Sequence, residues 1–474
     1  MAGYQTFRQV VYAGSFEGST SIGLGVRART AGTKEDSYWA KGSPRRSPVI
    51  RLRGWGDGAA AGLAGSGAAG GPEPVTTSRV DAAMSTKNRV WRQAALAVVL
   101  LVSGCTSSTE EPAPSASSPN PFASLEHQVQ LFLDEGAVAA VVQIRWPKGE
   151  WSRAYGVRDL ETRTPAQPTD RAAVASVTKT VTAVAVLKLV DDNLIGLDDP
   201  VNDVIPGFTT SLTPPAPITV RQLLSHTSGM PEVTDALPKD VDFRPVLAQT
   251  LTMERGLQLA GTLPWSSDDV GAFKYSNTNY LALGLLIQTL RDKPIVHVLQ
   301  EEVLGPLGLK NTSLDRIDPH ETGILHGYVT LRGELVDTTD NTFLAGNPAG
   351  GAISTMADLN LLMAGIFQGR AVSASSLREM KTSPGFHPYG LGVWEHADGC
   401  SEDPRHEGRG GFWDYQTVAV SSADGRYQAA MTVTTPPMPT ELEDPSTQDK
   451  RDYLNDRIEF TLNETLDRIC KPAN

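Results

Sequence analysis

Three short strings, in a fixed order along the chain, carry the residue types of one acyl-transfer site. Ser176-Val-Thr-Lys179 offers a hydroxyl nucleophile with an amine three residues later. Tyr275-Ser-Asn277 offers a phenol and an amide, and His406-Glu-Gly408 offers an imidazole on a strand that ends in glycine. A Ser-x-x-Lys string occurs by chance roughly once in a chain of this size, so the hypothesis rests on the combination of all three.

The first string predicts an activated serine. A serine hydroxyl is a poor nucleophile at neutral pH and needs a base beside it. Ser176 stands where an apolar run predicts a helix over residues 177–190, so Lys179 lies on the same face, and the helix N-terminus offers N–H groups to an oxyanion. The alternative is an N-cap serine beside a surface lysine. The apolar residues on both sides favour a buried setting, where an unpaired lysine is costly.

The second and third strings supply the remaining groups. In an extended loop, residues two apart point the same way, so Tyr275 and Asn277 can enter one cleft. The alternative is a turn before a helix that begins near residue 279. Gly408 lets a substrate lie against its strand as an added edge. His406 has no second histidine at the spacing of a zinc site, so neither a metal nor a cofactor is predicted.

Together these strings resemble the motifs of the serine beta-lactamase and penicillin-binding protein superfamily, most closely its class C and D-alanyl-D-alanine carboxypeptidase branch. Three further strings fit the same superfamily, so the resemblance spans roughly residues 125–435. They are Tyr155-Gly-Val-Arg-Asp159, Leu223-Leu-Ser-His-Thr-Ser-Gly229 and Gly350-Gly-Ala-Ile-Ser-Thr355. His226, in the second of them, is interpreted as a structural histidine.

The resemblance assigns roles to the site residues. It implies that Lys179 and Tyr275 carry the proton from Ser176 to the leaving group. It implies that Asn277 binds the substrate amide and that His406 tunes the local charge. The N–H groups of Ser176 and Arg409 would then form the oxyanion hole.

Arg409 departs from the family pattern, which has a small hydroxyl residue or glycine at this position. Its guanidinium could bind a C-terminal carboxylate with two hydrogen bonds, or it could point to solvent.

The order of expected elements predicts an α+β fold. A helix over residues 125–135 and strands over 137–144 and 151–157 come first. Strand patterns return at 390–394, 412–420 and 428–434, and a helix over 452–469 ends the chain. Residues between 198 and 346 favour helices and loops. We therefore expect a catalytic domain over 124–474, with an antiparallel sheet flanked by helices and interrupted by an inserted, mostly helical domain.

The first hundred residues predict export. Residues 1–83 are rich in Ala and Gly and cannot build a core, so they are either a non-native or disordered upstream extension or a cytosolic region. Residues 84–104 read as a lipoprotein signal peptide that ends before Cys105, the predicted lipidation site. Residues 105–123 form a Ser/Pro-rich tether. The expected location is the outer face of a bacterial cell membrane, held by a lipid anchor.

The charge of the chain limits the classes of molecule that it can bind, and its cysteines allow one disulfide. The chain carries a net charge of −12, and its first 104 residues are basic, so the remainder is still more acidic and nucleic acid is excluded as a partner. Cys400 and Cys470 could pair outside the cytoplasm. We expect a monomer that takes a small peptide or beta-lactam substrate.

The first predicted function is a serine hydrolase that forms an acyl-enzyme, similar to a D,D-carboxypeptidase acting on D-amino-acid peptides of the cell wall. A class C-like beta-lactamase comes second, and an esterase or D-aminopeptidase third. One acyl-transfer site serves amides, lactams and esters, so the motifs do not separate these. A lipoprotein that binds penicillin or peptidoglycan without catalysis remains a further alternative.

Overall fold

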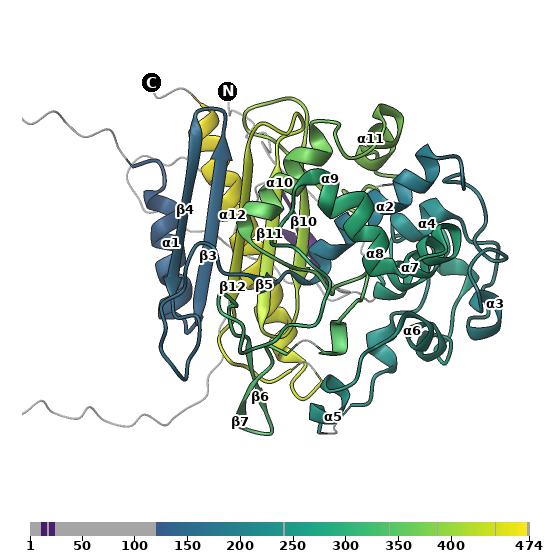
Figure 1. The fold of residues 1–474 in the computed structure, drawn as a ribbon, viewed down its shortest axis with the longest axis horizontal. Coiled ribbons are helices and arrows are strands. Elements are labelled where there is room, and N and C mark those ends of the chain that lie inside the picture. The colour runs from purple at the N-terminus through teal and green to yellow at the C-terminus, as the bar shows by residue number, and fades with distance from the viewer. Residues whose placement is uncertain are drawn as a thin grey trace, which may run out of the picture. The chain divides into compact units, whose positions relative to one another are not determined.

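A six-stranded antiparallel sheet lies at the centre of the catalytic part (Figure 1). Its strand order is β4-β3-β12-β11-β10-β9. Strands β3 and β4 are neighbours at one edge, and the last four strands of the chain, β9 to β12, complete the sheet. The bounds are β3 Ala139–Trp146, β4 Gly149–Gly156, β9 Trp394–His396, β10 Arg405–Gly411, β11 Tyr415–Ser421 and β12 Gln428–Thr434. The predicted α+β class with an antiparallel sheet is therefore confirmed.

The computed structural model describes residues 11–16, 19–23 and 120–471, except residues 240, 241, 341, 386 and 441. In the first two ranges, β1 Val11–Phe16 pairs with β2 Ser19–Gly23. The predicted signal peptide, Cys105 and residues 106–119 of the predicted tether lie outside the described residues. Among the helices of the described part, none is long and apolar enough to cross a membrane.

Side chains alternate between the two faces of the sheet, which is why both faces can be covered by helices. Ala140, Val142 and Ile144 of β3 pack with α1 Ala123–Asp134 and α12 Ser446–Cys470 on one face. Ala139 and Val141 point into the larger core on the other face. That core includes α2 Thr178–Asp191 and α10 Met356–Phe367, which lie across the sheet from α12 in Figure 1.

Short helices fill the segment between the two parts of the sheet. Those from residue 208 to residue 307 are α3 Phe208–Ser211, α4 Val220–Leu224, η2 Val233–Ala236, α5 Arg244–Leu247, α6 Met253–Ala260, η3 Ser267–Asp269, α7 Asn277–Arg291, α8 Ile295–Leu299, the π-helical turn η4 Gln300–Leu304 and α9 Gly305–Leu307. After them come β6 Tyr328–Leu331, β7 Glu334–Asp337, η5 Thr342–Leu344, β8 Ile353–Ser354 and α11 Ala374–Lys381, and β8 pairs with β5 Ala172–Ala173.

Two predicted strands have different bounds in the structure. Only Trp394 of the expected 390–394 strand is in β9, because Gly392 takes a left-handed φ of 88° that interrupts extended backbone. The expected strand over 412–420 begins at Tyr415, because residues 412–414 form the turn between β10 and β11. The β6–β7 hairpin was not predicted.

A disulfide joins Cys400, in the loop before β10, to Cys470 at the end of α12. Their Cα atoms are 6.3 Å apart, and 70 residues separate them in the chain. The bridge therefore ties the last helix to the strand that approaches the nucleophile.

Loss of this bridge should destabilise the protein. In the chain-entropy account, closing a loop of this length stabilises the native state by about 4 kcal/mol. We expect the Cys400→Ser/Cys470→Ser variant to unfold at a lower denaturant concentration than the oxidised parent. Reductant should affect only the parent. Equal unfolding midpoints for the two proteins would contradict the prediction.

Candidate active site

Ser176 lies in the 3-10 turn η1 Ala175–Val177, which leads directly into α2. The residue before it, Ala175, has a φ of 46°, a left-handed conformation that a side chain with a Cβ adopts at a cost. Strained backbone of this kind persists where the surrounding structure holds it. Ser176 is buried but borders a cavity, so its hydroxyl can meet a small molecule.

Lys179 connects the first two predicted strings. Its Nζ donates to Ser176 Oγ at 2.8 Å and to Asn277 Oδ1 at 2.7 Å. It also donates to the carbonyl oxygen of Ala349 at 2.8 Å. These contacts match the spacing argument that placed the amine beside the hydroxyl. Three acceptors hold one buried nitrogen at the nucleophile.

The Tyr275 ring lies over the same nitrogen, with its centroid 4.9 Å from Lys179 Nζ. The ring is almost fully buried and packs on His226, with 4.3 Å between ring centroids. The structure therefore brings Tyr275, Lys179 and Ser176 together from two distant segments. The hydrogen bond between Lys179 and Ser176 provides a path for a proton between the hydroxyl and the amine.

His226 supports this cluster as a neutral ring. Its Nδ1 accepts the Ser276 N–H at 3.3 Å and lies 3.1 Å from Asn279 Nδ2. An accepting Nδ1 places the ring proton on Nε2. Complete burial, and then the charge of Lys179, hold the pKa of His226 well below its ordinary value. The structure gives it packing contacts with Tyr275 and no contact with Ser176.

The structure corrects the third string: the glycine that lies against the nucleophile is Gly410. A Cβ on Gly410 would stand 2.1 Å from the Val174 carbonyl oxygen and 3.0 Å from Ser176 N. A Cβ on Gly408 would instead meet Thr180 Oγ1 at 3.0 Å, on α2. The strand reaches the nucleophile two residues later than predicted. Because strand side chains repeat every two residues, the same face of β10 is used.

The two-residue shift also changes which backbone N–H group of β10 can serve the oxyanion hole. Phe412 N donates to Tyr415 O on β11, so the N–H of Gly411 points to the opposite, open edge of β10. Gly411 also lines the cavity that Ser176 borders. The candidate pair of donors is therefore Ser176 N–H with Gly411 N–H, in place of the predicted Arg409 N–H.

His406 is not brought to the nucleophile. Its ring stacks on Phe367, with 4.9 Å between centroids and 12° between planes. Burial first, and then the charges of Lys381 and His396, lower the pKa of His406 to about 3, so the ring is neutral. The predicted role in tuning the charge of the cleft is corrected.

The Arg409 side chain points away from the cleft into a buried ion cluster, so neither predicted orientation holds. Its guanidinium pairs with Glu407 at 3.0 Å, with Asp456 at 3.0 Å and with Glu459 at 2.5 Å. His396 contacts two of these carboxylates, Glu407 at 2.9 Å and Glu459 at 3.0 Å. Three carboxylates therefore pair with the guanidinium that we had predicted to bind a substrate carboxylate or to point to solvent.

The cluster should make stability depend on pH. Burial lowers the pKa of His396, but the carboxylates of Glu407 and Glu459 outweigh it and raise that pKa to about 10. The folded pKa lies above the unfolded value, so the stabilisation is complete below about pH 6.5 and is lost as pH rises toward 10. We expect His396→Gln to flatten the fall in unfolding free energy over this window, by up to about 1.4 kcal/mol per pH unit. Parallel curves for the variant and the parent, from denaturation at several pH values, would contradict it.

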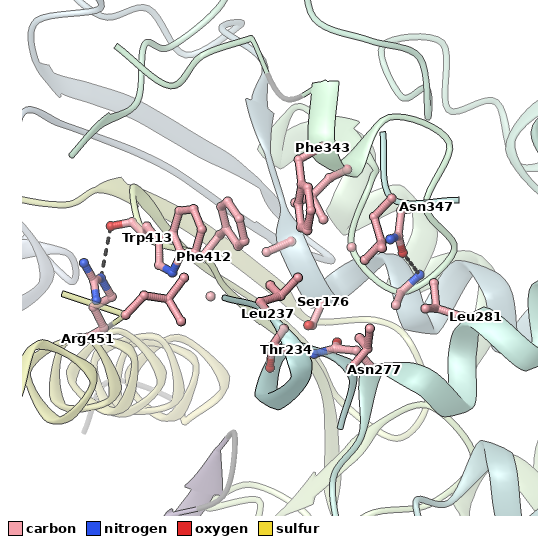
Figure 2. Close-up of a pocket in the computed structure, with 18 of the residues that line it drawn as sticks. Ser176, Thr234, Leu237, Asn277, Leu281, Phe343, Asn347, Phe412, Trp413 and Arg451 are labelled. Carbon is pink, nitrogen blue, oxygen red and sulfur yellow. Dashed lines mark hydrogen bonds between the residues drawn. The ribbon is translucent and has the colours of Figure 1, made fainter. Parts of the chain in front are cut away.

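A cavity of about 80 Å³ opens beside Ser176 (Figure 2). Ser176, Asn277 and Gly411 are among the residues that line it. Its other walls are largely apolar and come from distant parts of the chain: Val233, Leu237, Leu251, Leu281, Phe343, Leu344, Phe412, Trp413 and Leu442. Figure 2 shows Phe343, Phe412 and Trp413 on one side of Ser176, with Asn277 and Thr234 on the other.

Removing either proton carrier should slow the chemistry without unfolding the protein. We expect Lys179→Ala and Tyr275→Phe each to lower kcat by about 100-fold or more, the usual range for general acid–base groups. Thermal unfolding should show that each variant remains folded. A variant with parental kcat would remove that residue from the proton path.

Comparison with known proteins agrees with this geometry. Residues 126–450 match the protein family described as Beta-lactamase. Protein flp of Staphylococcus aureus (strain MW2) is 30% identical over 199 residues, which are 40% of this chain and 36% of that protein. Penicillin-binding protein 4* of Bacillus subtilis (strain 168) is 24% identical over 247 residues, 49% of this chain and 53% of that protein. The chain thus spans between about a third and a half of these relatives' length.

Solved structures share the fold. A D-stereospecific amidohydrolase from Streptomyces sp. superposes with a TM-score of 0.58 at 26% identity. The match covers 66% of this chain and 94% of that protein.

Proposed function

This chain belongs to the beta-lactamase family and is a serine hydrolase of that fold, and on that premise we propose that it hydrolyses amides and short peptides of D-amino acids through an acyl-enzyme on Ser176. The observation that carries the proposal is the contact of Lys179 Nζ with both Ser176 and Asn277. It supplies a base for the hydroxyl and an amide for the substrate within one cleft.

The proposed reaction has two steps. Ser176 Oγ attacks the substrate carbonyl carbon while its proton passes to Lys179 Nζ. The oxyanion that forms accepts hydrogen bonds from Ser176 N–H and Gly411 N–H. As the C–N bond breaks, Tyr275 donates its phenol proton to the leaving amine and takes in its place the proton held by Lys179. Water then attacks the serine ester; one of its protons passes through the same groups to Ser176 Oγ, and the acid is released.

The strand beside the nucleophile favours amides over substrates with a free carboxylate next to the cleaved bond. A D,D-carboxypeptidase must bind that carboxylate. On β10, Gly408 and Gly410 approach η1 and Gly411 lines the cavity, while Arg409 is held by other carboxylates. This strand therefore offers no cationic side chain to the substrate. The likeness to a D-stereospecific amidohydrolase supports the same direction.

The D,D-carboxypeptidase is the second candidate, because one acyl-transfer site can serve peptides as well as amides. Arg451 lines the cavity at a distance from Ser176 (Figure 2), but it is buried, and its guanidinium donates to the Trp413 carbonyl oxygen, to Thr447 Oγ1 and to the Pro439 carbonyl oxygen. The predicted lipid anchor at Cys105, export to the outer face of the membrane and a monomeric state remain parts of the proposal and rest on sequence alone.

The apolar walls of the cavity favour a substrate with a large apolar side chain. Burial of an aromatic or branched side chain against Leu237, Phe343 and Phe412 is favourable by roughly 25 cal/mol per Å² of apolar surface. We therefore propose that preferred substrates carry a large apolar group and that D-alanine derivatives are poorer ones.

Kinetics on four substrates separate the candidates. We expect kcat/KM for D-phenylalanine amide to exceed that for L-phenylalanine amide by about 100-fold and that for N-acetyl-D-Ala-D-Ala by about tenfold or more. The fourth substrate is a chromogenic cephalosporin, and Ser176→Ala is the control. Faster cleavage of D-Ala-D-Ala would establish the carboxypeptidase, and faster cephalosporin turnover would establish the lactamase. No turnover by folded protein would favour the non-catalytic lipoprotein.

A further inference from the structure

Glu232 lies one residue after Pro231 and contacts Asn277 twice. Its Oε2 accepts the backbone N–H of Asn277 at 2.5 Å, and its Oε1 accepts from Asn277 Nδ2 at 3.0 Å. The residue also caps η2, where Oε1 accepts the Thr234 N–H at 3.0 Å. A helix cap needs only the last of these contacts, so the two bonds to Asn277 call for another explanation.

The contact determines how the Asn277 amide is oriented. A carboxylate only accepts hydrogen bonds, so the NH₂ group of Asn277 must face Glu232. The amide oxygen is then left to face Lys179 Nζ, 2.7 Å away. A flipped amide would set oxygen against oxygen at Glu232 and NH₂ against a donor at Lys179. The hydrogen bonds to Glu232 and Lys179 therefore allow only one orientation of the Asn277 amide.

From this geometry we propose that Glu232 is a positioning residue of the active site: it locks the Asn277 side chain and so holds Lys179 directed at Ser176. The inference rests on the proposed acyl-enzyme chemistry and adds a residue that touches none of the reacting atoms.

Glu232→Gln is the sharpest variant because it keeps the shape and removes the charge. Each partner of the carboxylate on Asn277 is a donor, so the new NH₂ group meets a donor whichever way it turns. We expect the initial acylation of Ser176 by p-nitrophenyl acetate, followed as the burst of p-nitrophenol, to slow by about 10- to 100-fold. The concentration of p-nitrophenyl acetate that gives half the maximal burst rate should change little, because Glu232 is not among the residues that line the cavity.

Three further variants separate positioning from folding. Asp235→Asn removes an exposed carboxylate from the same short helix, which is the same change in charge, and should leave the burst rate unchanged. Glu232→Asp keeps the charge and the cap but loses reach to Asn277, so it should be folded and slow. In an Asn277→Ala background, Glu232→Gln should slow the burst little further, because the side chain that Glu232 orients is already absent.

The outcomes are distinct from those of the substrate proposal, since p-nitrophenyl acetate carries no D-amino acid. A Ser176-dependent burst in the parent with equal rates in Glu232→Gln and Glu232→Asp would overturn the positioning role and leave the hydrolase function standing. Full additivity with Asn277→Ala would also overturn it. A parent with no burst would overturn the acyl-enzyme mechanism and this inference together. A slow Glu232 variant in a protein inactive on D-amides would retain the positioning role and reject the substrate.

Discussion

The rest of the site depends on one buried nitrogen. Lys179 Nζ is held between Ser176 Oγ, Asn277 Oδ1 and the Ala349 carbonyl oxygen, at 2.7–2.8 Å from each. A buried amine without such partners would be costly, so the fold must bring three distant segments to one point. The inserted helices do this: α7 begins at Asn277, and Ala349 stands in the loop before β8. The central sheet closes the fourth side, where β10 meets η1.

The sequence predicted the parts of the site that depend on local spacing. Ser176 and Lys179 are three residues apart at a helix start, and helical geometry alone places them in contact. The α+β order of elements followed from apolar periodicity in the same way. The position of the third motif does not depend on local spacing. His406-Glu-Gly408 and Gly408-Arg-Gly410 both end in glycine on the same face of one strand, and only the close approach of Gly410 to Val174 O and Ser176 N distinguishes them.

Two side chains show why charges are hard to place from sequence. Arg409 looked available to a substrate, but strand alternation turns it toward α12, where Asp456 and Glu459 are supplied by a helix some 50 residues later. Glu232 drew no attention in the sequence, because an acidic residue after Pro231 is an ordinary helix cap. Its contact with Asn277 joins residues 45 positions apart and becomes visible only in the fold. Asn277 and an acidic residue 45 positions away therefore combine into one site only through tertiary contacts.

The central claim is that the Lys179 amine makes Ser176 the nucleophile of this protein. The most direct test is to trap the folded protein with a fluorophosphonate, which reacts only with activated serines, and to locate the adduct by peptide mass spectrometry. We predict a single adduct on Ser176, which the Lys179→Ala variant forms about 100-fold more slowly. An unmodified Ser176, or an adduct on another serine, would contradict the account.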